Sequence, residues 1–146
     1  MSLNPENKCA HLYSQEVDLT KATIEGMFEM QKHLQDSLAF KGKAIDYDEA
    51  TFTQKVADIK SQWVNFNLEM AELIEKLPHK RWKTYTEEQK LDFTSEEHRL
   101  ETLYEFIDCW HFFMNIGLAL GIDGETFKKL YLTKNKENFD RQTRGY

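Results

Sequence analysis

Two pairs of carboxylates, each with a spacing of three residues, lie in separate parts of the chain. The first pair is Glu69 and Glu72, in LEMAELIEKL, and the second is Glu105 and Asp108, in YEFIDCWHFF. Residues three apart on a helix lie on neighbouring lines, so each pair would direct two carboxylates at one spot. Four hard oxygen donors that face one another across two helices suit Mg²⁺ or Mn²⁺. The spacing therefore predicts a divalent metal site between two helices.

The second pair lies in an apolar setting. Residues 103–120 are apolar on nearly all sides, which predicts a buried helix, yet from residue 101 onward polar residues recur at intervals of three and four. This polar stripe consists of Glu101, Glu105, Asp108, His111 and Asn115. An unpaired carboxylate inside a protein costs several kcal/mol, so the acids of the stripe need cations. We expect His111 to orient Asp108; the alternatives are a metal ligand and a satisfied core histidine.

Each carboxylate pair also has a purely structural interpretation. The Glu-x-x-Glu pattern is common on helices, so Glu69 and Glu72 could belong to a solvated face. For Glu105 and Asp108 the alternative is a salt bridge that joins two helices.

Residues 131–146 carry cations and amides that complement the acids. Lys134, Asn138 and Arg141 recur at intervals of four and three, so one helical face presents an ammonium, an amide and a guanidinium. Although such a run is often only a solvated face, it suits phosphate oxygens, and arginine can bind two of them at once. Acids for a metal and cations for phosphate in one small chain favour metal-assisted phosphoanhydride chemistry.

Composition limits the remaining possibilities. A length of 146 residues predicts one domain, residues 1–146, and only 6 Gly and 2 Pro predict long helices with few turns. The net charge of -6 argues against binding to a nucleic-acid backbone. Cys9 and Cys109 are too few for a disulfide scaffold, no signal peptide opens the chain, and the acids within 103–120 argue against a membrane span. We therefore expect a cytoplasmic protein.

The predicted fold class is all-α. The four expected helices span residues 20–39, 48–77, 94–120 and 124–138, and the last six residues are expected to be irregular. Their predicted boundary signals are an Asp48 cap, Pro78 as a stop, a Thr94–Glu97 capping box, Gly121 as a stop and an Asp123 cap. The polar connection after Pro78 is long enough to be a lid or a short helix with turns.

Four blocks of residues resemble a known superfamily. They are the ExxE and ExxD pairs, the HKRWK stretch, and the ending Tyr-x-x-Lys-Asn-x-x-Asn-x-x-Arg-Gln-x-x-Gly-Tyr. This order is similar to that of the all-α nucleoside triphosphate pyrophosphatases, which include the MazG proteins and the dimeric dUTPases. The resemblance runs from residue 30 to the end of the chain. It is greatest to the dCTP/dUTP pyrophosphatases of T-even-like phages, through MQKHLQ, IDCWHFFMN and KNKENFDRQTRGY.

The resemblance implies a four- to five-helix bundle, a homodimer, and hydrolysis of a deoxynucleoside triphosphate between its α and β phosphates. Glu69, Glu72, Glu105 and Asp108 match the metal ligands of the family, which imply two or more Mg²⁺ ions per site, or Mn²⁺ in their place. The positions that match phosphate-binding residues are Lys134, Asn138, Arg141 and Tyr146, with Lys83 as a weaker match.

Gln31 and Gln35 match the base pocket of the family. Gln35 falls where typical dimeric dUTPases carry Asn, whereas the phage dCTP/dUTP enzymes carry Gln. A glutamine amide contains both a donor and an acceptor, so it can rotate to satisfy either uracil or cytosine. The resemblance thus implies pyrimidine substrates, dUTP, dCTP or both. Without it, both glutamines could be polar spots on an amphipathic helix.

Three other functions remain as alternatives. A MazG-like house-cleaning pyrophosphatase would act on another or a modified nucleotide. A di-iron bundle needs two Glu-x-x-His motifs, whereas this chain offers only Asp108-x-x-His111. A non-enzymatic helical adaptor would use the apolar seam of the second helix but leaves the polar stripe unexplained.

Overall fold

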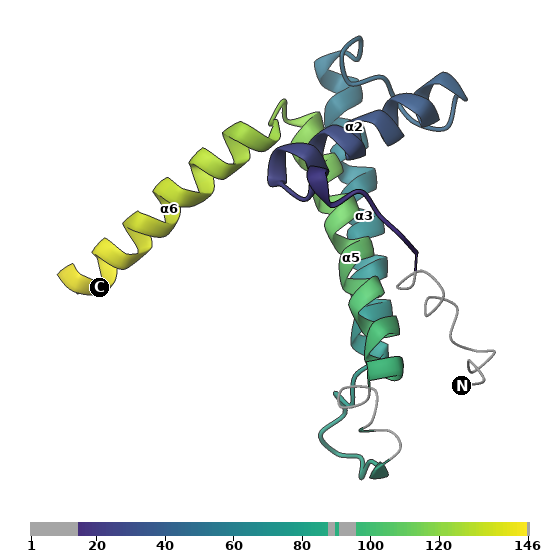
Figure 1. Ribbon diagram of the computed structural model, residues 1–146, viewed down its shortest axis with the longest axis vertical. Helices are drawn as coiled ribbons and strands as arrows, with labels where there is room; N and C mark the ends of the chain where they lie inside the picture. Colours follow the sequence, from purple (N-terminus) through teal and green to yellow (C-terminus); the bar gives the residue numbers. More distant parts are fainter. Residues whose placement is uncertain (1–14, 88–89, 91–95, 146) are drawn as a thin grey trace. The chain divides into compact units, whose positions relative to one another are not determined.

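The computed structural model describes residues 15–87, 90 and 96–145, and every regular element within these ranges is helical (Figure 1). The elements are the short 3-10 helix η1 (Leu19–Lys21) and the α-helices α2 (Ile24–Phe40), α3 (Phe52–Glu75), α5 (Glu96–Ala119) and α6 (Gly124–Arg144). The all-α prediction is confirmed. None of these helices is both long enough and apolar enough to span a lipid bilayer.

The chain divides into two compact units, and each is described by itself. Of the described residues, unit 1 contains those within 15–17 and 60–113, and unit 2 contains those within 18–59 and 114–145. The first predicted helix is interrupted early, because η1 ends at Lys21 and the Thr23 hydroxyl then caps α2 by accepting from the Gly26 amide at 3.0 Å.

The second predicted helix begins at a different residue from the one expected. A reciprocal capping box starts α3: the Thr51 amide donates to Gln54 Oε1 at 2.8 Å, and the Gln54 amide donates to Thr51 Oγ1 at 3.3 Å. The predicted Asp48 cap is wrong, because the Asp46 carboxylate accepts from the Asp48 amide at 2.9 Å and forms a turn there. The Asp48 side chain instead pairs with Lys32 at 2.9 Å.

The junction between α5 and α6 agrees with its sequence signals. Gly121 has a φ of 79°, and the Ile122 amide donates to the Gly117 carbonyl at 2.9 Å, which closes α5 in the manner of a glycine C-cap. Asp123 then caps α6 by accepting from the Thr126 amide at 2.8 Å. Thr94 of the predicted capping box for α5, and the side chain of Glu97, lie outside the described part of the chain.

Helix α6 continues to Arg144, beyond the predicted end at Asn138. Glu137 Oε1 accepts from Arg141 Nε at 3.0 Å and from Arg144 Nη2 at 2.8 Å. Ion pairs at a spacing of four residues support a helix, and two arginines in the last turn suit the negative end of its dipole. The expectation of an irregular tail is therefore wrong for the described residues up to Arg144.

In unit 1, α3 and α5 run antiparallel and side by side (Figure 1). The rings of Phe66 and Phe113 lie 6.5 Å apart, whereas just after the end of α3 the Lys76 ammonium lies 3.7 Å from Glu105. Because residue numbers rise along α3 while those of the contacted residues fall along α5, the two segments form a hairpin. This hairpin places the two carboxylate pairs on facing helices.

In unit 2, the start of α6 packs against the start of α2. The rings of Phe28 and Phe127 are 5.4 Å apart, and Lys128 forms an ion pair with Glu25. A Cβ atom at Gly124 would lie 2.4 Å from the Glu25 Cα, so the backbones approach too closely for any other residue.

The prediction that residues 103–120 are buried on all sides is wrong. Cys109 and Met114 are buried, as the sequence predicts, but Phe106 is 55% exposed. Apolar side chains on the parts of α5 that no other helix covers stay accessible.

Candidate functional site

Three of the four predicted metal ligands come together in unit 1. Glu69 on α3 and Glu105 and Asp108 on α5 each offer a carboxylate oxygen, and these oxygens all lie within 4.8 Å of one another. We call these three residues the acidic cluster. The helical spacing of three residues explains why Glu105 and Asp108 point the same way, and the α3–α5 hairpin brings Glu69 opposite them.

The protonation behaviour of the acidic cluster reflects its crowding. Burial raises the pKa of Glu69, and the nearby negative charges of Glu72, Asp108 and Glu105 raise it further. Burial is also the main cause of the raised pKa of Glu105, and the Lys76 charge opposes that shift. Both carboxyls thus lose their protons less readily than usual, which is the condition that a bound cation would relieve.

Glu72 lies at the edge of this arrangement. Its charge raises the pKa of both Glu69 and Glu105, so it is near enough to interact with them. Its carboxylate does not belong to the group of oxygens within 4.8 Å. The four predicted ligands therefore form three close donors and one neighbouring charge.

Lys76 contributes a cation that the sequence analysis missed. Its ammonium nitrogen lies 3.7 Å from a Glu105 oxygen and 3.9 Å from a Glu101 oxygen. Lys76 follows Glu69 by seven residues, which is close to two helical turns, so the shared face could have been read from the sequence. Lys76 is thus the counter-ion that the acids of α5 were expected to need.

His111 lies beside the acidic cluster but is not a core residue. Its Nδ1 is 3.7 Å from Asp108 Oδ1, which is longer than a hydrogen bond, and its side chain is 47% exposed. The exposure excludes the buried core histidine. Its role in orienting Asp108 stays a prediction.

The chemistry of the donor set fits a hard divalent cation. All three close donors are carboxylate oxygens, and the group contains no histidine or cysteine within the described residues. Oxygen-only ligation suits Mg²⁺ or Mn²⁺ and differs from the Glu-x-x-His ligation of di-iron bundles. Asp108 is also half-exposed, so a metal with its bound substrate could reach the carboxylates from solvent.

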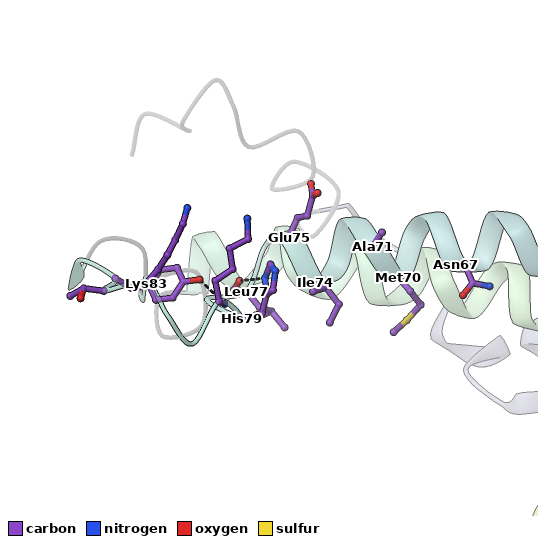
Figure 2. Close-up of a pocket in the computed structure, with 11 residues that line it drawn as sticks. Asn67, Met70, Ala71, Ile74, Glu75, Leu77, His79 and Lys83 are labelled. Carbon is purple, nitrogen blue, oxygen red and sulfur yellow. Dashed lines mark hydrogen bonds between the residues drawn. The ribbon is translucent and has the colours of Figure 1, made fainter.

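Lys83 lines a cavity on another part of unit 1. This cavity of about 820 Å³ lies between α3 and residues 77–85, and Figure 2 shows Lys83 and His79 beside it. The ring of His79 contacts the Leu77 carbonyl at 3.1 Å. None of the four predicted metal ligands lines this cavity, so the structure does not join Lys83 to the acidic cluster.

The predicted phosphate-binding residues of α6 belong to unit 2. Lys134 and Asn138 line a cavity of about 460 Å³ with Tyr131, whose ring stacks on Phe127 at 6.5 Å. Arg141 is engaged by Glu137, as described above. Tyr146 lies outside the described residues. Because α6 and the acidic cluster belong to different units, their meeting in one site stays a prediction.

The two predicted base-binding amides are buried in unit 2. Gln31 is 4% exposed and Gln35 is 5% exposed, so neither is a polar spot on an exposed helix face. Gln31 Nε2 donates a hydrogen bond of 2.7 Å to Oδ1 of Asn115, which is itself buried. Asn115 belongs to the polar stripe of the sequence, but no role was predicted for it.

Comparisons with known proteins agree with these features. The model of a dUTPase family matches residues 23–129. A dCTP pyrophosphatase of Enterobacteria phage LZ5 is 34% identical over 168 aligned positions, which cover 96% of this chain and 98% of that protein. A dCTP pyrophosphatase of Enterobacteria phage T4 is 44% identical over 70 positions, or 46% of this chain and 41% of that protein. No solved structure matches the chain.

The family match spans most of the chain, including both carboxylate pairs and both buried glutamines. The relative from phage LZ5 aligns over nearly its whole length. These matches therefore favour an enzyme over the alternative of a non-enzymatic helical adaptor. The chain belongs to the dUTPase family and is a nucleoside triphosphate pyrophosphatase of the dUTPase/dCTPase type.

Proposed function

We propose that the chain hydrolyses a pyrimidine deoxynucleoside triphosphate, dCTP, dUTP or both, to the monophosphate and pyrophosphate with the help of a divalent metal. The acidic cluster is the observation that carries this proposal, because three carboxylates within 4.8 Å of one another offer a set of oxygen ligands that suits a divalent cation. The names of the relatives support the substrate class, since both phage proteins are dCTP pyrophosphatases and the matching family is a dUTPase family.

Glu69, Glu105 and Asp108 would hold Mg²⁺, or Mn²⁺, with Glu72 completing the ligands when two or more ions bind. A divalent ion held there supplies positive charge to the triphosphate oxygens and acidifies water. The Glu105 side chain is only 15% exposed, and the Lys76 ammonium lies 3.7 Å from one of its carboxylate oxygens. Asp108 is open to solvent and is the carboxylate that would face the incoming triphosphate.

Lys134, Asn138 and Arg141 would bind the phosphates, with Tyr146 and Lys83 as further contacts. Lys134 and Asn138 are four residues apart on α6 and line one cavity, which supports a shared ligand. Arg141 would exchange the Glu137 carboxylate for a phosphate oxygen, since a guanidinium forms similar charged hydrogen bonds with either.

Gln31 and Gln35 would read the base. They occupy successive turns of α2 and are both buried, so a base that reached them would be shielded from water. Their amides can donate or accept, which suits both uracil and cytosine.

We also propose that the chain acts as a homodimer. Large apolar side chains are exposed on two helices: Trp63 of α3 is 60% exposed and Phe139 of α6 is 70% exposed. Exposed apolar residues of this size are typical of surfaces that another chain covers. A second copy is the occupant that the dimeric members of the superfamily suggest.

A pyrophosphate-release assay tests the proposed function. We expect turnover of dCTP, dUTP or both with Mg²⁺, little turnover of dTTP or dATP, and none in EDTA. Asp108→Asn keeps the shape of the side chain but removes an anionic ligand, so turnover should collapse while the protein stays folded. Glu49→Gln removes an exposed charge elsewhere and is the matched control. Normal turnover by Asp108→Asn would refute the metal site, and preferred turnover of another or a modified nucleotide would favour the MazG-like alternative.

A further inference from the structure

Two buried amides form a direct pair in unit 2. Gln31 on α2 and Asn115 on α5 are 84 residues apart in sequence, and Gln31 Nε2 donates to Asn115 Oδ1 at 2.7 Å. The side chains are 4% and 3% exposed. Buried amides are costly unless they are hydrogen-bonded, so this contact stabilises the position of both groups.

The pair also determines what else Gln31 can do. While its N–H faces Asn115, its carbonyl oxygen is directed elsewhere and can only accept a hydrogen bond. If both amides rotate together by half a turn, Asn115 becomes the donor and Gln31 presents N–H instead. The contact between the two residues is kept in both orientations, so neither orientation leaves this contact broken.

The two pyrimidines of interest require these two opposite orientations. Uracil has a donor at N3 and an acceptor at position 4, whereas cytosine has an acceptor at N3 and a donor at position 4. An amide held in a single orientation would satisfy only one pattern at a given atom of the base.

We propose that Asn115 is a positioning residue for base selection, which holds the Gln31 amide and reverses together with it. This inference rests on the proposed function, in which Gln31 contacts the base. It gives a role to Asn115, a polar residue that lies between the apolar residues Met114 and Ile116. Asn115 itself does not touch the base and acts through Gln31.

Two substitutions each prevent the paired amides from reversing, and both leave an oxygen directed at the base. Asn115→Asp can only accept, so Gln31 must donate to it and present its oxygen to the base. Gln31→Glu also presents only oxygen, because its carboxylate accepts from the Asn115 N–H. Both variants should therefore change the ratio of kcat/KM for dCTP to that for dUTP in the same direction, by about tenfold or more. The assays are run at about pH 8, since burial raises the pKa of a carboxyl group.

Asn115→Ser is the control, because it removes the amide of residue 115 but its shorter hydroxyl can donate or accept and so does not fix Gln31 in one orientation. It should lower kcat/KM for both substrates while the ratio stays within about threefold of the wild-type value. Circular dichroism and thermal melting verify the fold of each variant. If Asn115→Asp does not fold, Gln31→Glu compared with Asn115→Ser decides the question.

The outcomes distinguish a failure of the proposed function from a failure of the proposed role of Asn115. A wild-type enzyme that hydrolyses neither dCTP nor dUTP refutes the proposed function. A wild-type enzyme that hydrolyses them, with variants that lose both activities equally, refutes the role of Asn115 in base selection and leaves only a structural one. Ratios that move in opposite directions in Asn115→Asp and Gln31→Glu also refute it.

Discussion

The ammonium nitrogen of Lys76 lies 3.7 Å from a carboxylate oxygen of Glu105, beside a cluster of three acids. A cation at this place reduces the repulsion between carboxylates when no metal is bound. It also repels a divalent ion that enters the same space. The relationship therefore links the stability of the metal-free protein to its affinity for metal.

Replacement of Lys76 by Met should separate these effects. The apolar stem is kept and the charge is lost, so Mg²⁺ should bind more tightly, by up to about fivefold, and the EDTA-treated protein should lose no more than about 1 kcal/mol of stability. Calorimetric titration with Mg²⁺ and thermal melting in EDTA measure the two quantities. The control is Lys60→Met, which removes the charge of an exposed lysine within α3. Weaker Mg²⁺ binding by Lys76→Met would contradict this account.

The raised pKa values of Glu69 and Glu105 predict a pH dependence of the metal-free protein. Because their folded-state pKa values lie above the ordinary value of 4.5, the folded state binds protons that the unfolded state has already released. Their contribution to stability should therefore rise as the pH falls from neutrality through the raised values towards 4.5. Urea unfolding in EDTA at several pH values measures this change in the free energy of unfolding. Glu105→Gln should make the stability depend less on pH, and Mg²⁺ should do the same in the wild type. If neither changes the dependence of stability on pH, the raised pKa values of Glu69 and Glu105 would be contradicted.

Gly124 should not tolerate a side chain. A Cβ atom there would lie 2.4 Å from the Glu25 Cα and 2.8 Å from the Ile24 carbonyl oxygen, which are backbone atoms that cannot rotate away. Gly124→Ala should destabilise the protein by about 1–3 kcal/mol, measured by denaturant unfolding. Glu125→Ala, in the same helical turn, should change stability by no more than about 1 kcal/mol. Equal effects of the two substitutions would show that the close approach is not required.

Glu137 should compete with substrate for Arg141. Glu137→Gln removes the acceptor that holds Arg141 and Arg144, so the KM for the triphosphate should fall several-fold while α6 loses only about 0.5 kcal/mol per ion pair. The control is Asp140→Asn, which breaks the neighbouring pair with Lys136 but frees no arginine. A KM that rises in Glu137→Gln would mean that Glu137 positions Arg141 for substrate.

Gln35→Asn tests the second amide that we propose to contact the base. The shorter side chain matches the uracil-specific members of the superfamily, so the ratio of dCTP to dUTP activity should fall. One methylene group of reach changes discrimination by about 1–3 kcal/mol, or roughly 10- to 200-fold. Steady-state kinetics with both substrates measure the ratio, and an unchanged value would show that Gln35 does not contact the base.

Local signals in the sequence predicted some features correctly. Gly121 and Asp123 act within a few residues of their own positions, so the end of α5 and the start of α6 follow from residue type alone. The predicted start of α3 was wrong because Asp48 and Thr51 are both suitable N-cap residues, and the sequence pattern did not distinguish them. The choice between them depends on the turn that Asp46 forms, which no periodicity reveals.

In the candidate site, too, the sequence predicted relations between residues close in the chain but not contacts between distant ones. Helical spacing predicted the shared direction of Glu105 and Asp108, and the hairpin brings Glu69 to them. The contact between Gln31 and Asn115 spans 84 residues, so it depends on how α2 meets α5 and could not be read from spacing. The later part of α6 was misjudged because its ion pairs, rather than apolar residues, continue the helix.

The exposed apolar residues of α6 have a consequence for how this protein should be handled. Leu132 and Phe139 are 60% and 70% exposed, and a second copy that covered them would make folding and association one equilibrium. Mass action would then apply, and each tenfold dilution would remove about 1.4 kcal/mol of stability per mole of dimer. Melting temperatures of variants would be comparable only at a common protein concentration.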